Sequence, residues 1–285
     1  MKRIVILILL VLIAGVAGVV VRSSSRGTMA ELRGLVSHNN TGDVRQEIRE
    51  KFQLAPGARV ELSGLNGGVK IETSDTTTAE VYIERTAPSQ EDLDRRKVLV
   101  EATDNSLRIR SEKGDGGFFS RFLGSKSGER VTLKLPRQVS LYAKGVNGPF
   151  TAGDINGAVE ISGINGRVQI ESAMGHAMFK GINGTVVVGL KKLEQEGVSL
   201  SGINGNIELQ LGADVNADFD AHGMNGRVSS DMPNVSIDKS RRGNYTARIG
   251  TGGAEITAKG INGNIRFTRS TLAVTPAATA EAKGN

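Results

Sequence analysis

The chain has 285 residues, of which 4% are aromatic, with 37 glycines, no cysteine, no tryptophan and a formal net charge of +6. The absence of cysteine excludes disulfide bonds and a lipid-modified cysteine anchor, so stability has to come from burial and backbone hydrogen bonds. Aromatic residues are few and are not interleaved with basic ones, which argues against a nucleic-acid-binding surface.

The first predicted element is an apolar run at residues 4–21, preceded by Lys2 and Arg3. As a helix this run would span about 27 Å, close to one hydrocarbon core, and it predicts a transmembrane signal anchor over 1–21. Cleavage as a signal peptide is the alternative. The positive charges before the run place the body outside the cytoplasm, at the cell envelope, or secreted after cleavage. Residues 22–45 are interpreted as a linker.

A first β region is predicted over residues 46–135. Its apolar residues alternate, as at Val60 and Leu62, which is the period of a strand with one buried face. Ser89 precedes acidic residues and suits the cap of a short helix that interrupts the strands.

A phenylalanine-rich loop is inserted into this region at 116–124. Its apolar residues are Phe118, Phe119, Phe122 and Leu123. Two uses fit such a loop. It could cover a hydrophobic end of the fold, or it could contact a membrane or a partner.

Residues 136–268 are organised by a four-residue phrase, Gly-Ile-Asn-Gly or a near copy, which occurs eight times in the chain including one copy in the first β region. The asparagine and final glycine of these structural turn motifs are Asn66 and Gly67, Asn147 and Gly148, Asn156 and Gly157, Asn165 and Gly166, Asn183 and Gly184, Asn204 and Gly205, Asn225 and Gly226, and Asn262 and Gly263. From Asn147 the asparagines are 9, 9, 18, 21, 21 and 37 residues apart, and the worn copy at 172–175 divides the step of 18. The repeating unit is therefore one strand plus one turn of about nine residues. Glycine and asparagine suit these turns because they tolerate positive φ.

Apolar pairs keep the same nine-residue period, so that Val159 and Ile161 map onto Val168 and Ile170. The apolar residue inside the turn, such as Ile164, is predicted to point inward. Two all-β folds fit this pattern. The repeats favour a single-stranded β-solenoid, or β-helix, with asparagine stacked on asparagine along one edge. An antiparallel meander is the rival, because Asn-Gly between alternating strands is a strong hairpin signal.

Residues 47–267 carry these turns and an opening block that contains Phe52, Gly64 and Asn66. On these features the region resembles the bacterial "putative adhesin" domain family of unknown function and the related auto-transporter adhesin "head GIN" domains. The resemblance implies a single-stranded β-helix in exported or membrane-anchored proteins, with no established catalytic site. The chain departs from the pattern at 173–174 and in the less regular stretch 229–253. Residues 269–285 are of low complexity and are predicted to be disordered.

No arrangement of residues predicts catalysis. The histidines are His38, His176 and His222. They lack the converging spacing of metal ligands. Polysaccharide cleavage would need acidic or basic residues grouped on one outward face. Three aspartates at 214, 218 and 220 do cluster, but residues at alternate positions in and beside a turn are usually only solvated. We therefore expect a protein that is not an enzyme and has no metal and no cofactor.

The favoured function is a membrane-tethered binding module of the cell envelope, which contacts envelope glycans or a protein partner through outward strand faces, for example at Arg167, Gln169 and Glu171. One alternative is a structural scaffold that self-associates by pairing open strand edges. The other is an accessory protein in envelope-stress sensing that acts through a partner, since only three residues precede the apolar run.

Overall fold

The computed structural model describes residues 43–113, 127–193 and 197–270. The predicted anchor, nearly all of the linker, the phenylalanine-rich residues at 118–123 and the tail from 271 lie outside these ranges. Within the described ranges the chain is all-β apart from one short helix, α1 (Gln90–Arg95). No helix in these ranges has the length and apolar character needed to cross a membrane.

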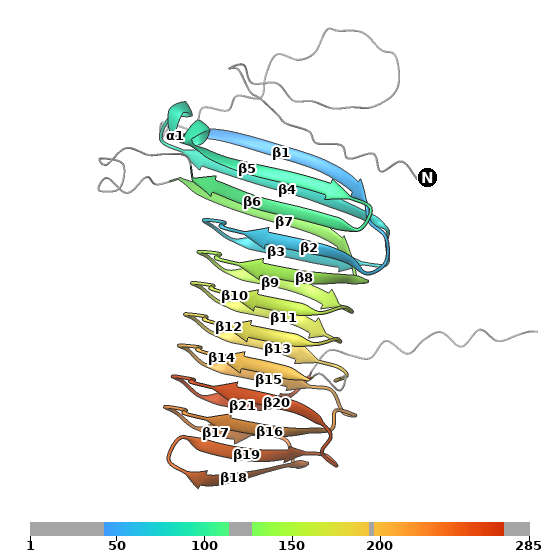
Figure 1. The fold of residues 1–285 in the computed structure, drawn as a ribbon, viewed down its shortest axis with the longest axis vertical. Helices are drawn as coiled ribbons and strands as arrows, with labels where there is room; N and C mark the ends of the chain where they lie inside the picture. Colours follow the sequence, from blue (N-terminus) through green and yellow to red (C-terminus); the bar gives the residue numbers. More distant parts are fainter. Residues whose placement is uncertain (1–42, 114–126, 194–196, 271–285) are drawn as a thin grey trace, which may run out of the picture.

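The strands form two large mixed sheets, which lie against each other down the long axis of the molecule (Figure 1). In spatial order the ten strands of sheet A are β1 (Val44–Gln53), β4 (Thr78–Ala87), β7 (Gly128–Pro136), β3 (Val69–Ser74), β9 (Phe150–Ile155), β11 (Val168–Ala173), β13 (Val186–Leu190), β15 (Ile207–Leu211), β21 (Ile265–Arg269) and β17 (Val228–Ser230). The eleven strands of sheet B are β18 (Val235–Arg241), β19 (Asn244–Ile249), β16 (Ala217–His222), β20 (Ala254–Lys259), β14 (Val198–Ser201), β12 (Ala177–Lys180), β10 (Val159–Ser162), β8 (Val139–Lys144), β2 (Ala58–Ser63), β6 (Ser106–Lys113) and β5 (Arg96–Thr103).

From β8 to β15 the chain alternates between the sheets, and each strand from β8 to β13 pairs in parallel with the strand two further along. Val159, for example, is in register with Ala177, eighteen residues on, and Ala177 is in register with Val198, twenty-one residues on. These offsets of eighteen and twenty-one residues equal the spacing predicted from the asparagine turns. The antiparallel meander is wrong for this region, because its consecutive strands would pair with each other in one sheet.

We call one sheet B strand, the turn after it and the following sheet A strand a rung; the turn contains the four-residue phrase. Seven rungs carry the asparagine turn. They are β2–β3, β8–β9, β10–β11, β12–β13, β14–β15, β20–β21 and β16–β17, in the order in which they stack.

That order departs from the order of the sequence near both ends of the stack. β20 lies between β14 and β16, and β21 lies between β15 and β17, so the last rung of the chain is inserted before the preceding one. The less regular stretch 229–253 explains how this is possible. It forms the antiparallel hairpin β18–β19. In this hairpin β19 pairs with the edge of β16 that faces away from β20, and the chain then returns to form β20 between β14 and β16.

The core lies between the two sheets and is built from the alternate residues predicted to face inward. Val159, Ile161, Val168 and Ile170 are all buried, as is the turn residue Ile164, which confirms the predicted inward positions. The aromatic rings are few but central. Phe219 and Phe267 of neighbouring rungs meet edge to face, with their ring centroids 5.1 Å apart.

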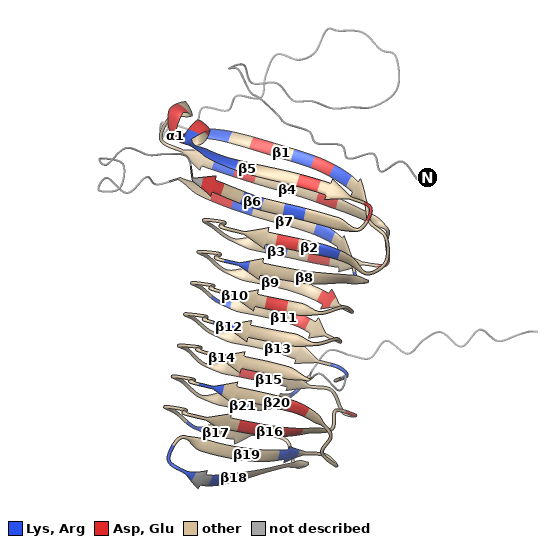
Figure 2. Ribbon diagram, viewed as in Figure 1, with Lys and Arg blue, Asp and Glu red and all other residues tan. Residues whose placement is uncertain are grey.

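The N-terminal end of the stack is more highly charged than the rungs below it (Figure 2). Here β1, β4 and β7 pair in antiparallel fashion, and α1 begins at Ser89, whose hydroxyl accepts a hydrogen bond from the backbone N of Asp92. The predicted cap is thereby confirmed. Outward residues of β1 form ion pairs with β4, such as Arg45 with Glu84 at 2.6 Å. Charges of this kind protect an edge strand from pairing with another chain.

Candidate functional site

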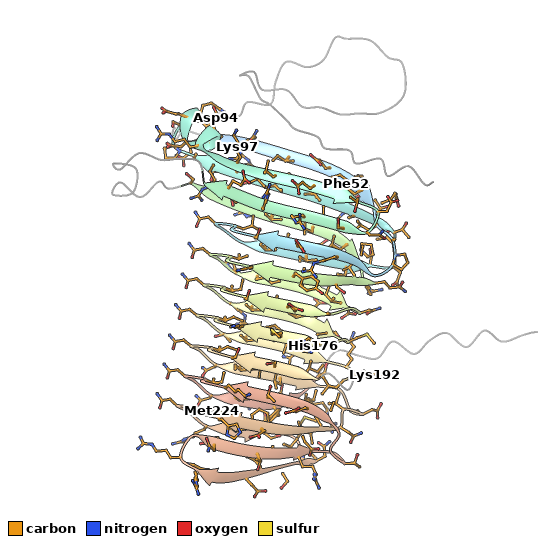
Figure 3. The ribbon with its side chains drawn as sticks, viewed as in Figure 1. Phe52, Asp94, Lys97, His176, Lys192 and Met224 are labelled. Carbon is orange, nitrogen blue, oxygen red and sulfur yellow. The ribbon has the colours of Figure 1, made fainter. Side chains whose placement is uncertain are left out.

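Seven of the eight turn motifs lie on one side of the stack, which we call the turn edge. It consists of residues 63–68, 144–149, 162–167, 180–185, 201–206, 259–264 and 222–227. Met224 marks this edge in Figure 3, and Lys192 lies on the opposite edge.

The two glycines of a turn are required for different reasons. Gly181 has a φ of 61°, which is the left-handed region, and a Cβ added there would have ordinary contacts, the nearest at 3.8 Å. Gly184 has a φ of 153°, which side chains rarely adopt, and it also has too little space, because an added Cβ would lie 2.2 Å from the backbone oxygen of Gly166 in the next rung. The first glycine therefore sets the direction of the chain, and the second allows the rungs to approach closely.

The asparagine side chains of the turn edge form a continuous hydrogen-bonded ladder. Each Nδ2 donates to the Oδ1 of the asparagine one rung nearer to the N-terminal end. The six distances are 2.9 Å from Asn147 to Asn66, 3.0 Å from Asn165 to Asn147, 3.2 Å from Asn183 to Asn165, 3.2 Å from Asn204 to Asn183, 2.9 Å from Asn262 to Asn204 and 2.9 Å from Asn225 to Asn262. The predicted stacking of asparagine on asparagine is confirmed, with the inserted rung in its structural place.

The donor end of this ladder is held by groups outside the repeats. Asn66 Nδ2 donates to the backbone oxygen of Ser127 at 2.8 Å, and the backbone N of Asn66 donates to the buried carboxylate of Glu129 at 3.1 Å. All the ladder amides point their N–H groups towards the N-terminal end, so the positive ends of their dipoles face that way. A carboxylate is therefore electrostatically favoured at this end.

The eighth motif does not belong to the ladder. Asn156 and Gly157 lie on the opposite edge, where the backbone N of Asn156 donates to Arg137 O at 2.9 Å. The worn copy is on the same edge, since Met174 N donates to Ile155 O at 3.0 Å. The turn at Asn156 therefore lies apart from the seven turns of the ladder, although its sequence is a near copy of theirs. Gly157 also differs from the ladder glycines, because only a shortage of space, with an added Cβ 2.6 Å from Val139 O, requires glycine there.

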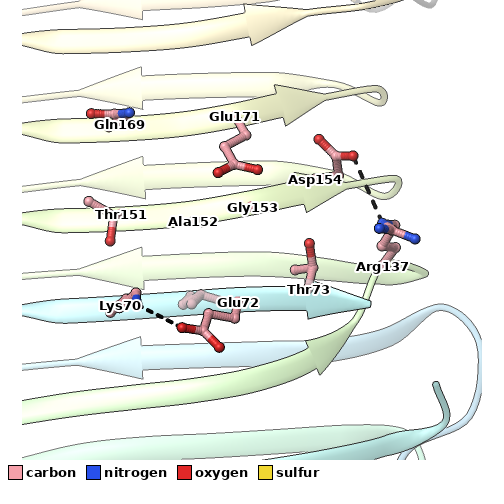
Figure 4. Close-up of a pocket in the computed structure, with 11 residues that line it drawn as sticks. Lys70, Glu72, Thr73, Arg137, Thr151, Ala152, Gly153, Asp154, Gln169 and Glu171 are labelled. Atoms are coloured by element: carbon pink, nitrogen blue, oxygen red, sulfur yellow. Dashed lines mark ion pairs between the residues drawn. The ribbon is translucent and has the colours of Figure 1, made fainter. Parts of the chain in front are cut away.

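A shallow depression of about 380 Å³ lies on the outward face of sheet A (Figure 4). Gly153 of β9 lines it, together with Thr73 of β3 and Glu171 of β11. A Cβ at Gly153 would lie 2.5 Å from Thr73 Oγ1. The polar side chains that line the depression are Lys70, Glu72, Thr73, Arg137, Thr151, Asp154, Gln169 and Glu171.

Charge is balanced over most of this depression. Lys70 Nζ lies 2.7 Å from Glu72 Oε1, and this hydrogen bond lowers the pKa of Glu72 below its ordinary value. Arg137 and Lys191 both approach Asp154, with nitrogen–oxygen distances of 3.9 Å and 2.9 Å. Ligand pockets are usually enclosed and mostly apolar. An open, polar depression is suited instead to shallow contacts with hydroxyl-rich or charged groups.

Two of the three outward residues predicted for binding lie in this depression. Gln169 and Glu171 line it, and Glu171 has no ion-pair partner among the described residues. Arg167 is exposed at the turn edge instead. Gly153 was not predicted to line this surface, because a single glycine before Asp154 belongs to no recognisable motif.

The residues considered for metal binding are not brought together. His222 Nε2 lies 3.1 Å from Asp220 Oδ2, and His176 is half-buried on the opposite edge. Across 43–113, 127–193 and 197–270 no three His, Asp or Glu side chains form a group that would hold a metal ion.

No protein-family model matches the chain, and no curated protein matches it. Among solved structures, the chain is similar to a putative cell adhesion protein from Clostridium sporogenes, with 13% identity and a TM-score of 0.43 over 79% of this chain and 100% of that one. It is also similar to a putative adhesin from Bacteroides fragilis, with 12% identity and a TM-score of 0.26 over 78% and 97% of the two chains. A putative adhesin from Parabacteroides merdae has 12% identity and a TM-score of 0.27 over 78% and 96%. At these scores the likeness does not establish a shared fold.

Proposed function

We propose that the protein is a non-enzymatic, adhesin-like binding module of the bacterial cell envelope. In this proposal the alternating parallel rungs are coils of a single-stranded β-solenoid related to the "putative adhesin" and "head GIN" domains. Residues 1–21 tether it to the membrane with the body outside the cytoplasm, or are cleaved so that the body is secreted.

The observation that carries the proposal is the polar depression on sheet A. Its side chains come from neighbouring parallel strands whose backbones are held in register, so they form a preorganised surface. Thr151, Gln169 and Glu171 offer donors and acceptors at spacings fixed by the strands, and unpaired Glu171 is available to accept hydrogen bonds. Envelope glycans, which present many hydroxyl groups, are the ligands that such a surface suits, and a protein partner is the alternative.

Self-association into a scaffold is less well supported by the strand edges. The outward charges of β1, including Lys51 paired with Glu80 at 2.6 Å, oppose pairing with a second copy. We propose no enzymatic activity and no cofactor. A role in envelope-stress sensing would require a separate partner protein.

The test is co-sedimentation of the full chain, kept in a neutral detergent, with cell-wall material from which lipids have been extracted. This removes insertion of residues 4–21 into lipid as a cause of pelleting. We expect the chain to pellet only with walls, and the variant Gln169→Ala/Glu171→Ala to pellet less. The matched control is Glu160→Ala/Ser199→Ala on the outward face of sheet B. Pelleting that is unchanged by the sheet A variant, or no pelleting at all, would reject the proposed surface.

A further inference from the structure

A column of side chains follows the turn edge at the position immediately before each turn. Reading along sheet B, its residues are Ser63, Lys144, Ser162, Lys180, Ser201, Lys259 and His222. Each is in register with the next, so these are direct neighbours in the sheet. We call this the lysine column, because a lysine occupies every second rung from β8 to β20.

The alternation depends on the inserted rung. In the order of the sequence, His222 would follow Ser201 and Lys259 would come last. In the structure Lys259 pairs with Ser201 on one side and with His222 on the other. The insertion of β20–β21 therefore places three lysines at equal intervals of two rungs.

The whole turn edge carries positive charge without negative charge. Its seven segments contain no Asp or Glu, and their cationic residues are Lys144, Arg167, Lys180, Arg227 and Lys259. None of these five has an acidic partner among the described residues, and all five are exposed. Acidic residues lie beside the turn edge. Glu129 accepts from Asn66 N at its N-terminal end, and Glu61, Glu160 and Asp220 lie one column away on sheet B, where Asp220 is against His222. At the N-terminal end, by contrast, arginine and lysine are extensively paired with glutamate.

The spacing of the lysines has a physical cause. Like charges directly opposite each other on neighbouring strands are destabilising. With lysine on every second strand and serine between, the ammonium groups are about 10 Å apart, which is twice the strand spacing. This separation is close to the screening length of about 8 Å at physiological ionic strength, so electrostatic repulsion between the three ammonium groups is weak.

The asparagine ladder runs beside the lysine column, two residues beyond each turn's first glycine. The ladder uses one N–H of each amide, so the second N–H and part of the oxygen's accepting capacity remain for a ligand. The edge thus presents a periodic row of cations next to a periodic row of amides.

We propose that the turn edge binds a linear acidic polysaccharide along the axis of the stack. A chain with one carboxylate on every second sugar matches a cation on every second rung, and its hydroxyl groups face the asparagine amides. Nucleic acid fits less well, because no aromatic side chain lies in the seven segments to stack on bases. A membrane surface also fits less well, because the apolar turn residues such as Ile164 and Ile182 are buried.

This inference rests on the proposed binding function and specifies a second surface for it. The experiment measures binding of the full chain in neutral detergent to immobilised hyaluronan, which carries a carboxylate on alternate sugars, with uncharged dextran as the reference. We expect binding to hyaluronan and not to dextran. Lys144→Gln/Lys180→Gln/Lys259→Gln should weaken it by about tenfold, since three exposed charge contacts are removed. Because the contacts are exposed, binding should also weaken as salt is raised.

Two further variants test two points. The first asks whether binding depends on the lysine column or only on net charge, and the second asks whether it depends on the spacing of the lysines. Lys97→Gln/Lys192→Gln/Arg269→Gln removes the same charge from exposed positions elsewhere and should leave binding unchanged. Lys180→Ser/Ser201→Lys keeps the net charge but breaks the alternation, and should weaken binding to hyaluronan but not to inorganic polyphosphate. Equal losses from the two triple variants would overturn the proposal, as would tighter binding to single-stranded RNA or to vesicles of anionic lipid.

The outcome is distinguishable from failure of the proposed function. If walls pellet the chain through Gln169 and Glu171 while the lysine variant behaves as the parent, the envelope-binding function stands and the turn-edge site is wrong. If hyaluronan is bound through the lysine column while walls are not, the site stands and the envelope function is wrong.

Discussion

The two glycines of one turn provide a sharp test of how the rungs are held together. Replacing Gly184 by alanine adds a Cβ 2.2 Å from Gly166 O, whereas real Cβ contacts essentially never fall below 3.0 Å, so the two rungs must separate by at least 0.8 Å (3.0 − 2.2). That movement strains the backbone hydrogen bonds from Asn183 N to Ile164 O and from Gly166 N to Asn183 O, which are 2.8 and 3.0 Å long. Overpacking costs about 1–3 kcal/mol and a weakened hydrogen bond about 1 kcal/mol, so we expect Gly184→Ala to lower the free energy of unfolding by about 2–4 kcal/mol.

The control is Gly181→Ala in the same turn. Its Cβ has room, so only the left-handed backbone opposes it, at a cost of about 1–2 kcal/mol. Urea unfolding of the full chain, followed by circular dichroism in the same detergent, measures both variants against the parent. Asparagine at position 181 should be better tolerated than alanine, while asparagine at position 184 should not. Equal destabilisation by the two alanine variants would refute the separate roles assigned to the two glycines.

Three other predictions concern the core, the ladder and a half-buried carboxyl group. Ile164→Ala should cost about 2–5 kcal/mol in urea unfolding because the side chain is buried between the sheets, and a change within error would contradict its inward position. Asn183→Ala removes two side-chain hydrogen bonds of the ladder and should cost about 1 kcal/mol, whereas Asn156→Ala, outside the ladder, should cost almost nothing; similar losses would argue against the ladder. Burial raises the pKa of Glu50 above its ordinary value of 4.5, so its ionisation destabilises the folded state as the pH rises from about that value through the folded-state pKa. Glu50→Gln should therefore raise the thermal unfolding temperature at pH 7 and lose this advantage below pH 4.5, and a gain that is independent of pH would exclude ionisation as its cause.

Much of the local structure could be predicted because burial and turn chemistry act on neighbouring residues. The alternation at Val159 and Ile161 requires one buried face, and the nine-residue period requires equivalent strands. Stacking of Asn165 on Asn183 follows because identical amides satisfy each other best when they are in register. Each inference needs only the local pattern and the repeat length.

The order of the rungs could not be predicted in the same way. All seven turns have nearly the same sequence and shape, so any rung can stack on any other without a change in the local pattern. What decides the order is the hairpin β18–β19, whose pairing with β16 joins a strand of one rung to a segment outside the repeated pattern. The position of Asn156 on the opposite edge, by contrast, could have been predicted from the sequence. It lies nine residues from both Asn147 and Asn165, which is half a rung, and therefore falls on the opposite edge.

The polar depression could not be predicted from the sequence for a different reason. Its lining includes Gly153 and Arg137, which reaches Asp154 from the connection between β7 and β8. Neither residue belongs to a repeated motif. Only the register between β3, β9 and β11 shows that they share one surface.

The stacking order is tested most directly by distances between pairs of spin labels on the full chain, which has no native cysteine to interfere. One pair joins positions 144 and 259 and the other joins 144 and 222, all exposed residues of the lysine column. The inserted order predicts separations of about four and about five strand spacings, roughly 19 and 24 Å, so that position 259 is the nearer. If position 222 proves nearer to 144 than 259 does, the rungs stack in the order of the sequence, and the insertion of β20–β21 and the regular lysine column are both wrong.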